Sequence, residues 1–205
     1  MHRLDAKEIP QLAEFLAKQF WSTEEILIML KGLDSSRAKQ IAPLVIGLDI
    51  AFYGRYGDMW IYDQDCSGAV IGIDSRKRGF HYFWYYFCNR RKYLGKLNPC
   101  ERRILAKNEK DYSQVRDDLW FKKYGKSTYY VAWLAVETEH RGQGVLRKLL
   151  QHIFDYTQNS FSQIALETHT ASNVPIYEHF GFSLLETKSY SDQTITEYRM
   201  LKTLT

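Results

Sequence analysis

The fold of this chain is decided by residues 129–169, which read YYVAWLAVETEHRGQGVLRKLLQHIFDYTQNSFSQIALETH. Residues 129–137 are rich in aromatic and β-branched side chains, as are residues 161–169, so both segments are predicted to be strands. Between them, residues 141–158 read as a loop that leads into an amphipathic helix. The spacing assigns the apolar face of that helix to Leu146, Leu149, Leu150 and Ile153.

The loop before this helix reads Arg141-Gly142-Gln143-Gly144. A glycine-rich turn at a helix N-terminus exposes backbone N–H groups at the positive end of the helix dipole, which suits a pyrophosphate. Glycines also let the backbone approach phosphate oxygens closely. The loop is neither a Walker loop nor a complete dinucleotide fingerprint. Glycines make ordinary turns as well, so the loop alone leaves both interpretations open.

Further elements extend outward from this unit. Apolar spacing predicts helices over residues 7–20 and 36–53, and alternating patterns predict strands over 58–64 and 67–74. Ser22 and Glu25 form a capping-box pattern for a short helix that reaches Leu30. Residues 80–87 contain seven aromatic side chains in eight positions, and periodicity does not decide between strand and helix there.

The later part of the chain alternates between predicted helices and predicted strands. Asn98, Pro99 and Glu101 mark the start of a helix whose character persists through Trp120. A short helix over 174–180 is predicted to end at Gly181 in a left-handed cap. Two last strands follow, over 182–189 and 194–201. This order predicts a mixed α/β or α+β sheet in a single domain.

Composition excludes several classes of protein. The chain has 205 residues, of which 45% are hydrophobic and 25% charged, as in an ordinary globular domain. No stretch approaches the ~18 apolar residues of a membrane span, and the N-terminus has no apolar signal region, so we expect a cytoplasmic protein without a membrane partner. Three widely spaced cysteines, Cys66, Cys88 and Cys100, indicate reduced thiols and neither a disulfide framework nor a zinc site.

Positive charge is concentrated in one segment. Residues 76–123 hold 14 lysines and arginines against five acidic residues, although the net charge of the whole chain is only +4. Such asymmetry is found in proteins that bind nucleic acids or phosphates, and also in solvated helix faces. The acidic residues are interleaved with the basic ones, and the neighbouring aromatic run is too apolar for a stacking platform. We therefore favour the solvated faces and expect no nucleic-acid partner.

A second motif lies about 30 residues after the glycine loop, where Asn173 and Tyr177 are four residues apart and Gly181-Phe182 follow. With Leu134-Ala135-Val136 and the loop 141–146, these residues resemble the GNAT superfamily of N-acetyltransferases. The run from Leu166 to Phe182 looks most like the puromycin N-acetyltransferase branch. The resemblance covers residues 125–200 well, and residues 1–125 only in the order of elements.

The resemblance implies a GNAT acyltransferase fold: a mostly antiparallel mixed sheet of six to seven strands, flanked by helices, with a helical insert before the coenzyme-binding strand. The GNAT domain would span 1–205, with an acceptor-side part over 1–125 and an acetyl-CoA-binding core over 126–205. The chain departs from the family where Leu146 replaces a final Gly or Ala of the loop. We expect this side chain to point into the core between helix and sheet, which leaves the loop able to bind phosphate.

In the family, acetyl-CoA lies where the strand over 130–136 splays from the strand over 162–168. Carried over, the N–H groups of Gln143 to Leu146 would hold the pyrophosphate, with Arg141 near a phosphate. The N–H group of Val136 would stabilise the oxyanion of the tetrahedral intermediate. No metal is implied. The residues predicted to contact the coenzyme are Leu134, Ala135, Val136, Arg141, Gly142, Gln143, Gly144, Val145, Leu146, Asn173 and Tyr177.

The resemblance also implies how the protons move. Tyr177 is the candidate general acid, because a tyrosine is protonated at neutral pH and the departing thiolate needs a proton. Asn173 could cap the helix, bind the coenzyme, or do both. Glu167 is the first choice of general base for the attacking amine, and a relay through water remains an alternative. The weaker candidates for the base are His81, Glu137, His140 and His169. Glu139 and His140 directly precede the loop, and we expect them to be solvated.

The implied acceptor is a primary amine of a small molecule, and a homodimer is among the implied assemblies. For the aromatic run, one hypothesis is core packing of Trp84 and Phe87. The other is that Tyr82, Tyr85 and Tyr86 line an amine-binding cavity, because ring faces attract cations. The basic residues of 90–110 are candidates for the outer phosphate of the coenzyme or an acidic acceptor. An alternative function, favoured by Leu146, is an inactive coenzyme A-binding sensor or protein-interaction module.

Overall fold

The structure is a computed structural model, and it describes residues 1–113, 117, 119–125, 127–189 and 195–204. Within these residues seven strands form one sheet in the order β1-β2-β3-β4-β5-β7-β6. The strands are β1 His2–Arg3, β2 Asp58–Ile61, β3 Gly68–Asp74, β4 Thr128–Val136, β5 Gln163–Thr168, β6 Ser183–Ser189 and β7 Thr196–Thr203. Neighbouring strands are antiparallel except β4 and β5, which are parallel. This mixed, mostly antiparallel sheet confirms the predicted fold class.

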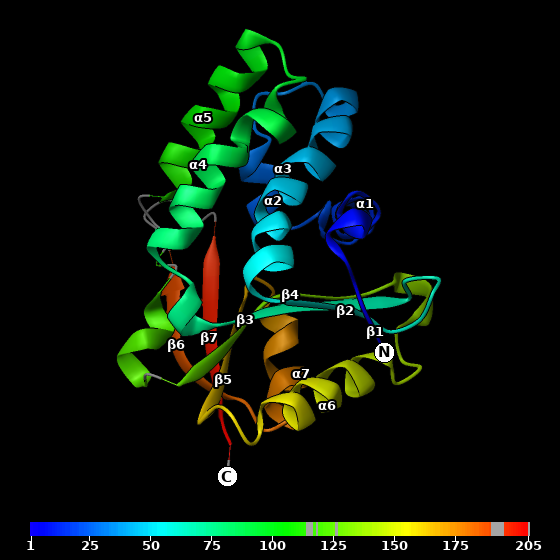
Figure 1. The fold of residues 1–205 in the computed structure, drawn as a ribbon, viewed down its shortest axis with the longest axis vertical. Coiled ribbons are helices and arrows are strands. Elements are labelled where there is room, and N and C mark those ends of the chain that lie inside the picture. Colours follow the sequence, from blue (N-terminus) through cyan, green and yellow to red (C-terminus); the bar gives the residue numbers. More distant parts are fainter. Residues whose placement is uncertain (114–116, 118, 126, 190–194, 205) are drawn as a thin grey trace.

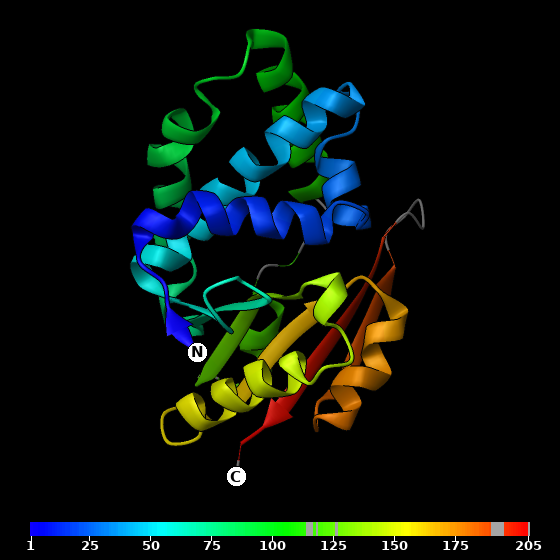
Figure 2. The same cartoon turned by 90° about the vertical axis from the view of Figure 1, so that its right-hand side faces the viewer.

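Helices cover both faces of the sheet (Figures 1 and 2). The helices α1 Ile9–Phe20, α2 Glu24–Met29, α3 Ser35–Tyr56, α4 Phe80–Leu94 and α5 Pro99–Ser113 lie on one face, which we call the α1–α5 face. The helices α6 Val145–Thr157 and α7 Val174–His179 lie on the other, the α6–α7 face. Short 3₁₀ turns occupy Ala6–Glu8, Ser75–Lys77, Trp120–Tyr124, Thr138–His140 and Ala171–Asn173.

Two apolar cores follow from this layering, one on each face of the sheet. Strand residues alternate between them, because successive side chains of a strand point to opposite faces. In β5, Ala165 belongs to the core of the α1–α5 face, whereas Ile164 and Leu166 belong to the core of the α6–α7 face. The alternation therefore fixes the side of the sheet on which each side chain of β5 lies.

Local sequence signals account for several helix ends. The predicted helix start at Asn98 is confirmed, and Asn98 and Glu101 form a capping box in which the backbone N–H group of each residue donates to the side chain of the other at 2.9 Å. Gly181 has φ +84° and ends α7 as predicted. The prediction that Ser22 caps the second helix is wrong, since Thr23 occupies the N-cap position. The helix that begins at Pro99 ends at Ser113, and residues 114–116 and 118 of its expected continuation lie outside the described residues.

The aromatic run is helical and forms most of α4. Core packing of Trp84 and Phe87 is a wrong expectation, because they are 59% and 76% exposed. Side chains that recur every three to four residues of a helix share a face, and α4 turns this pair outward with Phe80. The intervening Tyr82, Tyr85 and Tyr86 pack against the core of the α1–α5 face instead.

Candidate active site

The parallel strands β4 and β5 separate after three residue pairs. Thr128, Tyr129 and Tyr130 pair with residues 163–165, and beyond that point the two strands, both described throughout, make no further pairs. A β-bulge lies just past the separation, because Val131 and Trp133 face successive residues of β3 and Ala132 faces none. The bulge turns β4 away from β5, and the strands part where the sequence predicts.

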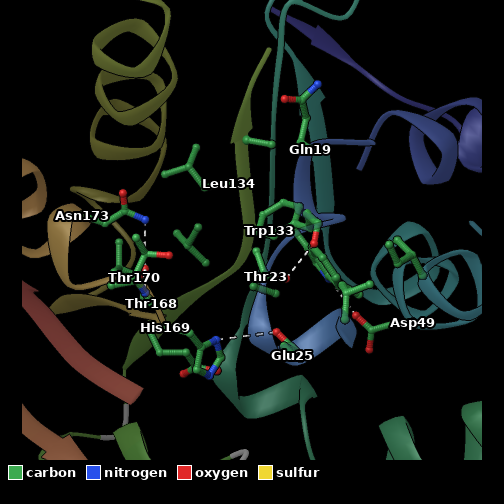
Figure 3. A pocket seen from close by; sticks show the side chains of 18 of the residues that line it. Gln19, Thr23, Glu25, Asp49, Trp133, Leu134, Thr168, His169, Thr170 and Asn173 are labelled. Atoms are coloured by element: carbon green, nitrogen blue, oxygen red, sulfur yellow. Dashed lines mark hydrogen bonds and ion pairs between the residues drawn. The ribbon is translucent and has the colours of Figure 1, made fainter. Parts of the chain in front are cut away.

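A cavity of about 1180 Å³ occupies this opening and extends to both faces of the sheet. Figure 3 shows how β4 divides it: Leu134 lies on the side of Asn173, whereas Trp133 lies on the side of Asp49. Of the residues predicted to contact a coenzyme, all but Gln143 line the cavity. The residues of β4, the glycine loop and α7 are therefore brought together around one space.

The glycine loop has the backbone that the sequence predicts. Gly142 and Gly144 have φ +77° and +80°, a region that favours glycine, and Gly144 is the N-cap of α6. A Cβ atom at either position would meet no atom within 4 Å. Gln143 differs from the expectation, because its backbone N–H group donates to the carbonyl of His140 at 3.4 Å. The first N–H groups of α6 have no acceptor within the helix, so they are available to an anion.

The first turn of α6 places Leu146 at the border of the cavity. The buried side chains of this helix include Val145, Leu149, Leu150 and Ile153, so Val145 takes the core position that the sequence assigned to Leu146. Leu146 is half-buried, packs against the core of the α6–α7 face and also lines the cavity. Leu146 thus packs toward the core as expected, and it also contributes to the lining of the cavity.

Tyr177 and Asn173 stand on the α6–α7 face of the opening. Tyr177 is buried and belongs to the core of that face, and burial raises the pKa of its hydroxyl to about 12. Within the described part of the chain this hydroxyl has no hydrogen-bond partner. Asn173 occupies the N-cap position of α7 without a capping hydrogen bond, contrary to one of its expected roles. Its amide instead donates to Thr168 Oγ1 at 3.0 Å.

Glu167 lies in the same opening on the α1–α5 face. It follows Leu166 in β5, so the alternation of the strand turns it away from the side that holds Tyr177. The Tyr130 hydroxyl donates to one carboxylate oxygen at 2.6 Å, and the Trp120 indole N–H group donates to the other at 2.5 Å. These two donors fix the orientation of the carboxylate. The two candidate proton-transfer groups thus lie on opposite faces of the sheet.

The other candidate bases are placed less favourably. Glu137 lies 2.9 Å from Lys18, and this hydrogen bond lowers the pKa of the carboxyl group. His81 is exposed and stacks on Tyr56, outside the residues that line the cavity. Glu139 is also exposed. His140 and His169 line the cavity, and His169 lies 3.8 Å from Glu25 (Figure 3).

Sequence reasoning missed several site residues contributed by the first half of the chain, of which Asp49 is the clearest. It lines the cavity from α3 and accepts hydrogen bonds from the Tyr82 hydroxyl at 2.5 Å and the Trp133 indole N–H group at 2.7 Å. A signal was present, since Asp49 is the one acidic residue within the apolar stretch 41–53. Of the three tyrosines proposed to line a cavity, Tyr82 and Tyr86 do so and Tyr85 does not.

The arginines that line the cavity lie at the end near the glycine loop. They are Arg141 and Arg147, and none of the lysines or arginines of residues 90–110 lines the cavity. Among the described residues no group of three metal-binding side chains occurs, and no helix there is long and apolar enough to cross a membrane. The cysteines Cys66, Cys88 and Cys100 form no disulfide with one another.

A seven-stranded mixed sheet that opens between two parallel strands, beside a glycine loop at a helix N-terminus, is the GNAT acyltransferase fold. Residues 126–185 match the family model described as an acetyltransferase (GNAT) domain. A curated relative is an uncharacterized N-acetyltransferase of Schizosaccharomyces pombe, 32% identical over 93 residues that make up 45% of this chain. The match spans 33% of the length of that relative.

Solved structures agree on the fold. The Corynebacterium glutamicum protein described as histone acetyltransferase HPA2 and related acetyltransferase matches 100% of this chain and 95% of its own, with 17% identity and a TM-score of 0.66. The polyamine N-acetyltransferase of Drosophila melanogaster matches over 99% of this chain and 98% of its own, with 14% identity and a TM-score of 0.56. At these identities the likeness concerns the fold.

Proposed function

We propose that the protein is an acetyl-CoA-dependent N-acetyltransferase that acetylates a primary amine of a small molecule. The observation that carries the proposal is the cavity through the opening between β4 and β5. The cavity connects the glycine loop, which is of a type that binds phosphate, on one face of the sheet with the oriented carboxylate of Glu167 on the other. The hydroxyl of Tyr177 lies beside the opening. A thioester and an amine that enter from opposite faces would meet there.

The coenzyme would enter from the α6–α7 face. Its pyrophosphate would lie against the N-terminus of α6, where backbone N–H groups and the helix dipole favour an anion. Arg141 and Arg147 add positive charge at that end of the cavity. The amide groups of its pantetheine arm would pair with the backbone of Leu134, Ala135 and Val136, on the edge that β5 leaves uncovered.

The backbone direction of β4 supports an oxyanion site at Val136. In an antiparallel pair, successive N–H groups of a strand point alternately toward and away from the partner. The N–H group of Glu137 donates to Ser67, on the β3 side, at 2.9 Å. The N–H group of Val136 therefore points the other way, into the opening. A donor held there would stabilise the oxygen charge that develops on the thioester carbonyl.

The transfer then needs two proton movements. The amine nitrogen attacks the thioester carbonyl carbon, so a C–N bond forms and the C–S bond breaks. Glu167 accepts the proton that the nitrogen loses, and Tyr177 donates a proton to the leaving sulfur, which gives the free thiol and an amide. Because burial raises the pKa of Tyr177 to about 12, its hydroxyl remains protonated at neutral pH. Proton exchange with solvent then returns Glu167 to its ionised form and Tyr177 to its protonated form.

Titration calorimetry with acetyl-CoA and coenzyme A, followed by an assay of thiol release with primary amines, tests the proposal. Micromolar coenzyme binding and amine-dependent thiol release are expected. Gly144→Glu places a carboxylate in the open space beside the loop and should abolish binding, whereas Gly144→Ala has the same strained backbone without the charge and should retain it. Absence of binding at millimolar coenzyme would refute the proposal.

Leu146 favours a second candidate function, a coenzyme A-binding module without transferase activity. Its side chain lines the cavity at the first turn of α6, where a bulky group restricts how deeply the coenzyme enters. This function predicts coenzyme binding without thiol release for any amine. Leu146→Ala would then restore release, and failure of that variant to bind more tightly or to react would argue against a role for Leu146.

The choice of acceptor is a separate matter. The Drosophila protein is named for polyamines and the Corynebacterium protein for histones, and at 14% and 17% identity neither name transfers to this chain. Function depends on the pocket and not on the fold. The acceptor of this chain therefore depends on its own residues.

A further inference from the structure

Two carboxylates in the cavity are held in the same way. Glu167 accepts hydrogen bonds from the Tyr130 hydroxyl and the Trp120 indole N–H group, and Asp49 accepts them from the Tyr82 hydroxyl and the Trp133 indole N–H group. Tyrosine and tryptophan are neutral donors, so they orient each carboxylate without cancelling its charge. Among the described residues neither carboxylate forms an ion pair with a lysine, arginine or histidine.

The other acidic residues that line the cavity lie near an imidazole or a guanidinium group. Glu25 lies 3.8 Å from His169, Glu109 lies 3.6 Å from Arg90, and Asp117 lies 3.7 Å from Arg199. The two arginines that line the cavity, Arg141 and Arg147, lie near the glycine loop. The guanidinium of Arg78 packs on the rings of Tyr82 and Tyr130 but, within the described part of the chain, forms no ion pair with Asp49 or Glu167. On the α1–α5 face these two carboxylates therefore offer anionic positions with which a ligand cation can pair directly.

From this arrangement we propose that the acceptor is an alkyl diamine or a longer polyamine. The inference rests on the proposed function. One nitrogen is presented at Glu167, where it loses its proton and attacks the thioester, and a second nitrogen remains protonated and binds Asp49. A monoamine would leave Asp49 without a countercharge. An α-amino acid of similar length would bring its own carboxylate into an anionic cavity.

The rest of the lining suits an alkyl chain between the two nitrogens. Apolar side chains on the α1–α5 face of the cavity come from three segments, and they include Ile26, Met29, Val45, Ile46 and Leu119. Methylene groups pack favourably against such a surface. Tyr82, Phe83, Tyr86 and Trp133 also line the cavity, and aromatic faces attract cations. The lining thus favours a diamine on an apolar chain over an amine surrounded by hydroxyl groups.

A matched pair of amines tests the inference. Thiol release is measured with 1,5-diaminopentane and with pentylamine, which have the same chain and differ in the second nitrogen. We expect kcat/KM for the diamine to exceed that for pentylamine by about 10-fold or more, mainly through a lower KM. Asp49→Asn keeps the size of the side chain and removes its charge, so the ratio of kcat/KM for the diamine to kcat/KM for pentylamine should fall to about 1 in this variant.

Two controls keep the result specific. Glu14→Gln removes an exposed carboxylate of α1 outside the cavity and should leave the preference for the diamine unchanged. Calorimetry with coenzyme A shows whether Asp49→Asn remains folded, and added salt, measured on the unmodified protein, should reduce the preference by screening the Asp49 charge. Equal kcat/KM values for the two amines, or a preference that survives in Asp49→Asn, would overturn the inference and leave the proposed function intact. Coenzyme binding without release from any amine would overturn the proposed function as well.

Discussion

Tyr177 is buried as a residue and lines the cavity, and its hydroxyl makes no hydrogen bond with the described residues, whereas both oxygens of Glu167 accept hydrogen bonds. A phenylalanine would fill the same space in the core of the α6–α7 face, so packing alone does not require a hydroxyl at this position. A hydroxyl without a protein partner beside the cavity is available to a ligand atom, such as the thioester sulfur, as the proposed general acid must be.

Tyr177→Phe separates stability from catalysis. Without coenzyme, the variant should unfold at the same temperature as the unmodified protein or a higher one, because the removed hydroxyl makes no bond. Its kcat should fall on the order of 100-fold, as for the loss of a general acid, with little change in KM for acetyl-CoA. Calorimetric unfolding and thiol-release kinetics provide the two measurements, and an unchanged kcat would exclude the role.

The expected pH dependence of kcat follows from the raised pKa of Tyr177. Because burial raises the pKa of Tyr177 to about 12, the acid stays protonated as the pH rises through ~10, the usual pKa of a tyrosine. In the unmodified enzyme kcat should not decrease between about pH 7 and pH 10. A decrease centred near pH 10 would indicate an acid in contact with solvent, which contradicts the buried position of Tyr177.

The cysteines differ in reactivity for a similar reason. Cys66 is buried, and desolvation raises the pKa of its thiol to about 11, whereas Cys88 and Cys100 are exposed. The thiolate is the reactive form. Iodoacetamide near pH 8 should therefore label two cysteines in the native protein and all three in denaturant, as measured by intact mass. Three labels on the native protein would contradict the burial of Cys66.

At the scale of one element, α4 is a segment whose secondary structure the sequence pattern does not determine. Seven aromatic residues in eight positions leave no periodicity, because both faces of the segment carry rings. The packing of Tyr82, Tyr85 and Tyr86 against α3 and its neighbours decides the question by burying one face. The glycine loop and α6 could be predicted because their sequence signals are local. The structure of α4 depends on contacts with other segments, so the local pattern did not predict it.

The exposed face of α4 gives a stability prediction. Phe87→Ala should change the free energy of unfolding by no more than about 0.5 kcal/mol, as for a surface position, because Phe87 is 76% exposed. Leu94→Ala in the same helix should reduce it by about 2–5 kcal/mol, because Leu94 is 4% exposed and belongs to the core. Urea unfolding of both variants provides the comparison, and similar losses would contradict the orientation of α4.

At the scale of the whole molecule, the α6–α7 side of the candidate site comes from the second half of the chain, whereas both halves contribute to the α1–α5 side. Residues 126–185 carry local signals, which is why the glycine loop, Asn173 and Tyr177 could be chosen from the sequence. Asp49 and Trp120 enter the site only through packing of distant segments against the sheet, and no spacing rule connects them with Glu167. The acidic character of the α1–α5 side of the cavity was likewise hidden by the basic composition of residues 76–123.

Coenzyme binding should be visible in the backbone of β4. Amide hydrogens that face the opening, such as that of Val136, have no strand partner on that side and should exchange with deuterium rapidly in the free protein. Coenzyme A should slow them at least 10-fold, whereas Val70 of β3, which is paired on both sides, should change little. Mass spectrometry of overlapping peptides measures both, and equal exchange with and without coenzyme would contradict the placement of the pantetheine arm.

The early separation of β4 and β5 also affects how the protein behaves when it is empty. Strand edges are ordinarily at the rim of a sheet, where proteins protect them against pairing with other chains. Here two bare edges lie in the middle of the sheet, and no strand among the described residues fills the gap between them. The coenzyme would act as that missing strand. Preparations depleted of nucleotide are consequently the ones in which an extended peptide, or a neighbouring molecule, could insert and initiate aggregation.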